Sequence, residues 1–587
     1  MSDAPESKES RESKVEAAKR QGRYLRGTIA ESLASDAESF SETDAQLLKF
    51  HGAYQQDDRD LRKKVRAAGG HKAYRFMVRV AIPAGRLTAE QYLVCDELAD
   101  RCGNGTLRIT TRQDFQFHGV LKRNLKETIA GVNRVLLTTL GGCGDVERNV
   151  MACPAPLADR PHVFVRDLAR RVAAELRPAT RAYHEIWLDG EKISPAGEEE
   201  PFYGPQYLPR KFKTGVALDT DNCVDVYADD CGLLASVEDG EVVGLNVLAG
   251  GGLGMTHRQK DTMARLADPV GFIAPEHGVE AVKTVAAIFR DHGNREDRRH
   301  ARIKYLIAAW GIDRFREEFR RRFPFELAPP RPLPKAVHHD HLGRHPQGDG
   351  RWFYGIFVEN GRIADGPARR VRSALREIVR AHRPAVVLTP SQNILMADLP
   401  SEDAISQVEA TLREHGVPTA EEVSAARRYA LACPALPTCG LALGEAERVM
   451  PQVVGEFEAE LEALGLRDAP ITIRMTGCPN GCARPYTADV AFVGRGPGVY
   501  NIYVGGGPGG DRVADLFATD VPIGEVFSRV RPLLGSWAAS RREGESLGDF
   551  YQRILARAEP RRSVTGLEEP TAEKLELPGD GPSSRGG

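Results

Sequence analysis

The sequence lacks the features of membrane and secreted proteins. None of its 587 residues falls in an apolar run of the length, about 18 residues, that crosses a bilayer. The N-terminus, MSDAPESKESRESKVEAAKR, has no apolar segment of a secretory signal, and its glutamates argue against an organelle transit peptide. We therefore expect a cytoplasmic protein with no membrane partner.

An excess of charge of one sign is also missing. Lys and Arg total 80 against 82 Asp and Glu, which gives a net charge of -2. This balance provides no overall basic surface, so we expect no nucleic-acid partner. The hydrophobic content of 41% and the charged content of 28% are typical of a globular protein, and the length allows about three to four domains.

Cysteine is scarce, with 10 residues in the whole chain. In a large cytosolic protein, paired cysteines are more often metal ligands or catalytic groups than disulfides. Most of the first six, between Cys95 and Cys231, are interpreted as single buried thiols. The last four form two pairs, in CPALPTC (residues 433–439) and in CPNGC (residues 478–482).

Four thiolates in two pairs can hold either one zinc ion or an iron–sulfur cluster. Structural zinc prefers tighter loops than the gap between Cys433 and Cys439, whereas a cubane cluster spaces its irons more widely. Prolines in both loops also break helices and leave backbone N–H groups free for cluster sulfides. The spacing favours a [4Fe–4S] cluster, with a zinc site and ordinary buried thiols as alternatives.

The segment LRITTRQDFQFHG, residues 107–119, is rich in hydrogen-bond donors. If it is one strand, alternate residues share a face. That face carries Arg108, Thr110, Arg112, Asp114, Gln116 and His118. A buried face of this kind must be paired, so it predicts a large polyanionic ligand. A solvated edge strand is the alternative.

Several cations stand among apolar or turn residues. They are Arg79 in FMVRV, Arg148 in VERNVM, and Lys211 and Lys213 in RKFK. On a strand, the two lysines would face the same way, and like charges held together usually indicate an anion between them. Two surface lysines are the alternative interpretation.

Strand-like and helix-like segments alternate, which predicts a mixed α and β fold. The proline-rich segment LAPPRPLPK, residues 327–335, indicates a boundary. The chain also repeats itself: residues 74–120 resemble residues 351–399, with Thr110 on Thr389 and Gln113 on Gln392. Glycine clusters follow a strand in both halves, at 246–254 and 501–510. The repeat predicts two related halves about a pseudo-twofold axis, with a shared site between them.

Several motifs, taken together, resemble a known family. FHGAYQQDDRD, TTRQDFQFHGV, YLPRKFK, GGGLGMTHR and TGCPNGCARP are similar to, and in the same order as, motifs of the sirohaem and [4Fe–4S] sulfite and nitrite reductases. The resemblance covers nearly the whole chain, from about residue 24 to about residue 548. It implies an internally duplicated α+β fold, with two ferredoxin-like half-domains and two sirohaem/cluster α/β domains.

The resemblance also implies a division of the chain. We expect a charged N-terminal arm (1–45), a first half-domain (46–145), a first sirohaem-binding domain (146–330), a second half-domain (345–410), an iron–sulfur cluster and sirohaem domain (411–558) and a disordered tail (559–587).

The residue roles that follow are those the resemblance implies. The cluster ligands would be Cys433, Cys439, Cys478 and Cys482, with Cys482 also bridging to the sirohaem iron. The catalytic cations around the anionic substrate would be Arg79, Arg148, Lys211 and Lys213. The residues that face the sirohaem and its carboxylates would be Arg108, Thr110, Arg112, Gln116, His118, Gln392 and Asn480.

The implied activity is that of an assimilatory sulfite reductase, the six-electron reduction of sulfite to sulfide. Lys213 stands where related nitrite reductases typically have asparagine, which favours sulfite over the alternative, ferredoxin-dependent reduction of nitrite to ammonia. The segment GGCGDVERNVMACPAP favours ferredoxin as the electron-donor protein over a flavoprotein reductase subunit. Some family members join a tyrosine to a cysteine near the haem, and Tyr54 and Cys143 are the candidates here.

Overall fold

The computed structural model describes residues 13–180, 182, 186–188, 191–193, 200–335 and 337–558. The expected tail at 559–587 and residues 1–12 of the expected arm lie outside this range. No helix among the described residues has the length and apolar character needed to traverse a bilayer.

The first half-domain is a sheet covered by helices. Its strands are β1 (Ala53–Asp57), β2 (Tyr74–Val80), β4 (Leu107–Ile109) and β5 (Phe115–Val120), and its helices are α5 (Ala89–Cys102) and α6 (Leu125–Arg134). Thr88 begins α5 with a capping box, because its hydroxyl accepts from Gln91 N–H while the Gln91 side chain accepts from Thr88 N–H.

The second half-domain repeats this arrangement. Its strands are β13 (Gly343–Pro346), β14 (Trp352–Ile356), β16 (Ala385–Leu388) and β17 (Ile394–Leu399), and its helices are α11 (Val371–His382) and α12 (Glu402–Glu414). The two half-domains exchange their edge strands. The sheet orders are β1-β2-β5-β4-β15 and β13-β14-β17-β16-β3, so β15 (Arg362–Ile363) joins the first sheet and β3 (Arg86–Leu87) joins the second.

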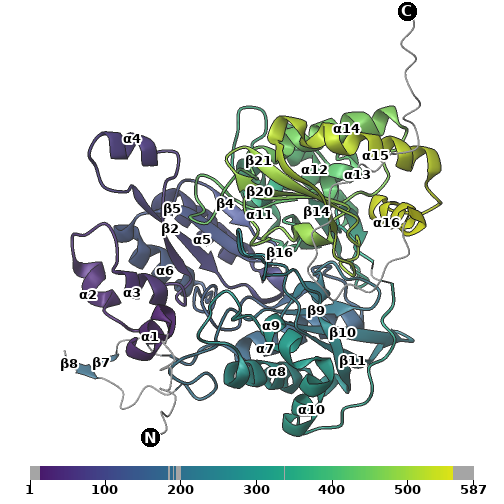
Figure 1. Ribbon diagram of the computed structural model, residues 1–587. Helices are drawn as coiled ribbons and strands as arrows, with labels where there is room; N and C mark the ends of the chain where they lie inside the picture. Colours follow the sequence, from purple (N-terminus) through teal and green to yellow (C-terminus); the bar gives the residue numbers. More distant parts are fainter. Residues whose placement is uncertain are drawn as a thin grey trace, which may run out of the picture.

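One hydrophobic core serves both half-domains. Tyr92, Phe115 and Phe117 of the first half and Tyr354 and Met396 of the second are buried in the same cluster. Figure 1 shows the helices α5 and α11 near the centre of the molecule, between the purple first half-domain and the green second one. The two half-domains therefore fold as one unit.

Two larger domains each carry a mixed five-stranded sheet. The first has the order β12-β11-β10-β9-β6 and the second β18-β19-β20-β21-β22. The strands of the first are β6 (Met151–Ala152), β9 (Thr214–Leu218), β10 (Cys231–Glu238), β11 (Glu241–Ala249) and β12 (Asp268–Ile273). Those of the second are β18 (Leu431–Ala432), β19 (Ile473–Thr476), β20 (Val490–Gly496), β21 (Val499–Val504) and β22 (Asp515–Pro522).

Helices flank both large sheets. The first domain contains α7 (Arg160–Glu175), α8 (Gly278–His292), α9 (Ile303–Trp310) and α10 (Ile312–Arg322), which lie in the teal lower part of Figure 1. The second contains α13 (Ala425–Arg428), α14 (Met450–Ala463), α15 (Val526–Ser540) and α16 (Leu547–Ala558), in its green to yellow upper part. The short α4 (Arg62–Ala67) stands out from the first half-domain, and β7 (Ile186–Leu188) pairs with β8 (Glu191–Ile193).

The predicted duplication is confirmed by local geometry. Gln113 and Gln392 both have a positive φ, 56° and 64°. Their side chains make reciprocal hydrogen bonds, since Gln113 Nε2 donates to Leu388 O at 3.0 Å and Gln392 Nε2 donates to Ile109 O at 3.4 Å. The pseudo-twofold axis therefore passes between these two loops.

Part of the expected charged arm is packed helix. The helices α1 (Lys14–Gln21), α2 (Ile29–Ala34) and α3 (Glu42–Leu47) precede β1. Lys19 is buried and donates to Leu208 O at 2.9 Å, and the buried Glu16 accepts from Arg295 Nη1 at 2.8 Å. Charged residues are buried here because each is paired with a group on the first large domain.

Candidate active site and cofactor centre

The donor-rich segment is a hairpin, so the expectation of one continuous strand is wrong. The strands β4 and β5 pair antiparallel, with Arg108 opposite Gln116, and residues 110–114 form the connecting turn. Gln113 adopts its positive φ there because its side chain is held by Leu388 O of the other half. Arg108, Gln116 and His118 still share a face, but Thr110 and Arg112 lie in the turn.

The four expected cluster cysteines lie together at the start of the second large domain. Cys433 follows β18, and Cys478 and Cys482 lie in the loop after β19. Electrostatic interactions connect Cys433 with Cys439, Cys478 and Cys482. Cys482 is exposed, whereas the other three are buried or half-buried. The thiols therefore face one another, with Cys482 on the open side.

The loops around these thiols direct N–H groups at sulfur. Gly477 N–H donates to Cys433 Sγ at 3.3 Å, and backbone N–H groups of Leu441 and Ala442 donate to Cys439. Burial and then the neighbouring Cys482 raise the pKa of Cys478 to about 12, so this thiol is protonated when no metal is bound. N–H donors and facing thiols form a donor set that fits an iron–sulfur cluster, because iron displaces the thiol protons and the N–H groups stabilise the sulfurs.

Two of the four expected cations lie near the exposed Cys482. Arg79 and Lys211 both interact electrostatically with the Cys482 sulfur. Arg79 Nη1 donates to Gly142 O at 3.4 Å, and Arg148 Nε donates to the same oxygen at 3.0 Å. Two guanidinium groups thus converge on one loop, and that loop holds them in place.

Lys211 and Lys213 have no hydrogen bond or ion pair closer than 4 Å to any described residue. Both side chains are half-buried. Burial and then Lys213 hold the pKa of Lys211 well below its usual value. Burial and then Arg112 lower the pKa of Lys213 to about 8. Two half-buried cations without partners fit an anionic ligand.

Arg108 and Arg112 differ from the expectation in their partners. Arg108 donates to Glu447 Oε2 at 2.9 Å and to Ala432 O at 2.7 Å. Arg112 donates to Asp229 Oδ1 at 2.8 Å and to Thr214 O at 2.9 Å. Protein acceptors therefore engage both guanidinium groups, and Arg108 ties the first half-domain to the residue before Cys433.

The other expected cofactor-facing residues lie around the same centre. Thr110 Oγ1 donates to Asp114 Oδ1 at 2.6 Å, and the adjacent Thr111 Oγ1 donates to Cys482 O at 2.9 Å. The Gln116 side-chain amide donates to His118 Nε2 at 3.1 Å, and its oxygen accepts from Arg79 Nε at 3.2 Å. Among the residues described, His118 Nδ1 and Gln392 Oε1 are buried without a hydrogen-bond partner. Asn480 interacts with Cys478.

Tyr54 and Cys143 lie beside the cations. Tyr54 interacts electrostatically with Cys143, Arg148 and Arg79, and burial followed by Cys143 raises its pKa to about 12. Arg79 Nη1 also donates to Cys143 Sγ at 3.4 Å. The structure thus brings the candidate pair to the edge of the anion site.

Sequence reasoning missed one group of residues. Cys153 and Cys223, interpreted as single thiols, lie with Asp221 and His341 so that their ligand atoms are all within 4.8 Å of one another. The signal that could have revealed the group is the repeat itself, because ACPAP at 152–156 corresponds to ACPALP at 432–437.

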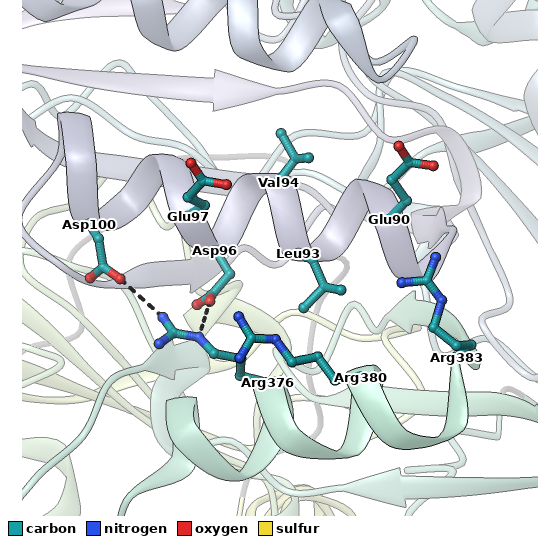
Figure 2. Close-up of a pocket in the computed structure, with 9 residues that line it drawn as sticks. All are labelled: Glu90, Leu93, Val94, Asp96, Glu97, Asp100, Arg376, Arg380 and Arg383. Atoms are coloured by element: carbon teal, nitrogen blue, oxygen red, sulfur yellow. Dashed lines mark hydrogen bonds and ion pairs between the residues drawn. The ribbon is translucent and has the colours of Figure 1, made fainter.

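A cleft of about 330 Å³ lies elsewhere, between α5 and α11. Figure 2 shows Asp96 and Asp100 on α5 pointing toward Arg376 on α11, which forms ion pairs with both. Arg380, Arg383, Glu90 and Glu97 also line the cleft. None of the expected site residues lines this cleft, so it is separate from the cofactor centre.

Four clustered thiols with cations nearby, in an internally duplicated α+β fold, are features of a protein that holds a metal cluster. The family model described as "Nitrite and sulphite reductase 4Fe-4S domain" matches residues 169–327 and 424–554. That described as "Nitrite/Sulfite reductase ferredoxin-like half domain" matches residues 69–135 and 344–415. The chain belongs to the nitrite and sulfite reductase family, which confirms the predicted fold class.

Curated relatives cover nearly the whole chain. A "Sulfite reductase [NADPH] hemoprotein beta-component" of Geobacillus kaustophilus is 45% identical over 92% of this chain and 95% of its own length. A "Sulfite reductase [ferredoxin]" of Synechococcus elongatus is also 45% identical, over 92% of this chain and 89% of its own length. These names and the 4Fe-4S family model confirm the predicted cofactors, a [4Fe–4S] cluster and the sirohaem of this family.

The same fold occurs in a solved structure. The Mycobacterium tuberculosis NirA protein superposes with a TM-score of 0.75, at 24% identity, over 92% of this chain and 95% of that one. This similarity supports the arrangement of the repeated sheets.

Proposed function

We propose that the chain is an assimilatory sulfite reductase, which reduces sulfite to sulfide in a six-electron reaction. The observation that carries this proposal is the position of Cys482, a cluster cysteine that interacts electrostatically with Arg79 and Lys211 of the anion site. The sulfite reductases to which the chain is 45% identical support the same substrate.

In this proposal the four cysteines hold the cluster, and Cys482 also binds the sirohaem iron. When bound, the two groups supply electrons one at a time at a metal beside the anion. The residues that would face the sirohaem are Thr110, Gln116, His118, Gln392 and Asn480. Arg108 and Arg112 position the loops around it, because protein acceptors already engage their guanidinium groups.

The four cations have two tasks. Arg79 and Arg148 are both anchored by Gly142 O, so their guanidinium groups can hold the anion in a fixed place. Each oxygen of sulfite leaves as water, which requires protons. Lys213, with a pKa lowered to about 8, is suited to give up a proton near neutral pH, and Lys211, whose pKa is also held well below its usual value, is suited to the same task.

Steady-state turnover tests the proposal. With reduced methyl viologen as donor, the purified protein is expected to form sulfide from sulfite with a higher kcat/KM than it forms ammonia from nitrite. Lys213→Asn should move this ratio toward nitrite, because it removes a cation that the more highly charged sulfite needs. A wild-type protein that favours nitrite would overturn the assignment of sulfite.

We propose ferredoxin as the physiological electron donor, because the segment around Cys143 favours it. Relatives with a ferredoxin donor and with an NADPH donor in their names are equally similar, so the donor needs its own experiment. Sulfide formation with reduced ferredoxin is compared with sulfide formation with an NADPH-oxidising flavoprotein. A preference for the flavoprotein would contradict this proposal and leave the substrate assignment intact.

We also propose a thioether bond between Tyr54 and Cys143, whose side chains interact in the structure. Its formation is a two-electron oxidation: the thiol hydrogen and one ring hydrogen are lost as the C–S bond forms, with molecular oxygen as the acceptor, which becomes hydrogen peroxide. Intact mass should be lower by these two hydrogens, and peptide mapping should find the two residues in one linked peptide. A free Cys143 thiol in the mature enzyme would contradict the proposal, and Cys143→Ala is the control.

A further inference from the structure

A second group of metal-ligating side chains lies in the first half of the chain. Cys153 follows β6, Asp221 and Cys223 lie in the loop after β9, and His341 lies just before β13. Cys153, Cys223 and Asp221 are buried, and His341 is 10% exposed. Three segments far apart in the sequence thus contribute one thiol pair, one carboxylate and one imidazole to the same interior point.

The distances between the ligand atoms are close to those of a tetrahedral zinc site. Cys153 Sγ is 3.4 Å from Asp221 Oδ2 and 3.8 Å from His341 Nε2, and His341 Nε2 is 3.0 Å from Asp221 Oδ2. Zinc bonds of about 2.0 Å to nitrogen or oxygen and about 2.3 Å to sulfur place tetrahedral ligands about 3.3–3.8 Å apart. Two of the three distances fall in this range, the distance between His341 and Asp221 is shorter, and Cys223 Sγ lies within 4.8 Å of the other three atoms, so small shifts would bring all four to one zinc ion.

The surrounding groups orient these ligands. Asp221 Oδ1 accepts from Cys223 N–H at 3.0 Å and from His339 N–H at 3.3 Å, which leaves Oδ2 facing Cys153 and His341. Arg166 interacts electrostatically with Cys153, and Arg484 interacts with Cys223. Two thiolates and one carboxylate exceed the charge of Zn²⁺, and these arginines offset the excess. Oriented ligands and compensating charges are typical of metal sites.

The group occupies the place that corresponds to the cluster site in the other half. Cys153 follows β6 as Cys433 follows β18. Cys223 lies two residues before Asp225, and Cys482 lies two residues before Arg484. Asp225 and Arg484 both precede a short 3₁₀ helix with left-handed φ of 53° and 54°. The duplicated fold therefore presents a pair of thiols at the same two positions in each half.

We propose that Cys153, Asp221, Cys223 and His341 bind one Zn²⁺ ion. Four protein ligands close the coordination sphere, so the ion has a structural role. It ties the segment before β13 to the first large domain and fixes β6, which directly follows the segment of Arg148. This inference does not depend on the substrate of the enzyme.

The metal content of the full-length holoenzyme tests the proposal. Protein from cells grown with added zinc, purified without a metal-affinity tag and rinsed with chelator, should contain about one zinc per chain. Zinc-edge X-ray absorption should show two sulfur neighbours at about 2.3 Å and two nitrogen or oxygen neighbours at about 2.0 Å. Cys223→Ala and His341→Ala should each lower the zinc content at least tenfold.

Cys95→Ala is the matched control, because Cys95 is an equally buried free thiol outside the group. It should keep its zinc. Iron content, measured on the same samples, reports on the cluster and haem separately, so loss of zinc alone distinguishes this site from general unfolding. Each of four results would overturn the proposal. These are wild-type protein without zinc, a zinc coordination shell without sulfur, iron in this site, and zinc retained by Cys223→Ala. If the variants do not fold, the absorption spectrum of the wild-type protein alone decides.

Discussion

At the scale of single residues, Lys213 predicts how activity depends on pH. Burial lowers its pKa to about 8, so the charged form is present below that pH and is lost as pH rises through it. Binding of an anion requires the charged form of Lys213, and the pH dependence of kcat/KM reports the ionisation of groups in the free enzyme. We expect kcat/KM for sulfite to fall as pH rises through about 8. A plot of kcat/KM against pH measures this.

Lys213→Arg is the control for this profile, because a guanidinium keeps its charge throughout the range. The fall near pH 8 should disappear in this variant. Nitrite, which does not titrate between pH 6 and pH 10, separates the titration of the enzyme from that of sulfite. A fall that persists unchanged in Lys213→Arg with nitrite would mean that Lys213 is not the group that titrates.

Cys478 and Cys482 should not be interchangeable. Cys482 is exposed and interacts with the cations of the anion site, whereas Cys478 is buried among the other thiols. Cys482→Ser should reduce the rate of sulfide formation from sulfite about 100-fold or more. It should also remove the magnetic coupling between haem and cluster. In Cys478→Ser, the haem and cluster that the protein still contains should remain magnetically coupled. Electron paramagnetic and Mössbauer spectra measure this coupling, and Cys95→Ser is the control for loss of a buried thiol.

If Cys482→Ser kept wild-type turnover of sulfite, the bridging role of this residue would be wrong. The four-cysteine cluster could still be correct, because iron content reports on it separately. Spectra and turnover therefore test different parts of the proposal.

At the scale of elements, Gly361 lies where the two half-domains approach each other closely. Its φ is 73°, and a Cβ atom there would lie 2.3 Å from Ile109 O. Gly361→Ala should lower the free energy of unfolding by about 3 kcal/mol or more, from backbone strain and from displacement of β4. Gly240→Ala is the matched control. It has the similar φ of 78° but open space around it, so strain alone should cost about 1–2 kcal/mol.

Denaturant unfolding of both variants measures the difference. If Gly361→Ala and Gly240→Ala lowered the free energy of unfolding equally, the close contact of Gly361 with Ile109 O would contribute nothing to the loss of stability. Iron content of Gly361→Ala gives a second readout, because β4 carries Arg108, which donates to Ala432 O beside Cys433.

The same elements show what the sequence could and could not predict. The match of Gln113 with Gln392 predicted the duplication, because both side chains serve the same contact across the axis. The turn at 110–114 could not be predicted, since it lacks glycine and proline and depends on Leu388 O of the other half. Spacing revealed the paired cysteines near the C-terminus. It did not reveal the group of Cys153 and Cys223, whose partner His341 follows more than a hundred residues later.

At the scale of the whole molecule, the exchange of β3 and β15 makes each half incomplete without the other. The first half-domain sheet ends on β15 of the second, and the second sheet ends on β3 of the first. The core between them mixes residues of both half-domains. Arg372 on α11 also pairs with Asp96 on α5 at 2.6 Å, with both side chains buried. The two halves therefore share their stability.

A cut in the exposed linker tests this dependence. Leu333 and Lys335 are exposed, so a protease site inserted between residues 333 and 334 should be cleaved without unfolding the protein. The two fragments should remain together on native gel filtration and keep turnover within about twofold, because the shared core and exchanged strands are unaffected. Expressed alone, residues 1–333 should not unfold cooperatively, since they lack β15 and expose the face that packs on Tyr354 and Met396. A monomeric fragment with a cooperative thermal transition would show that the first half is an independent unit.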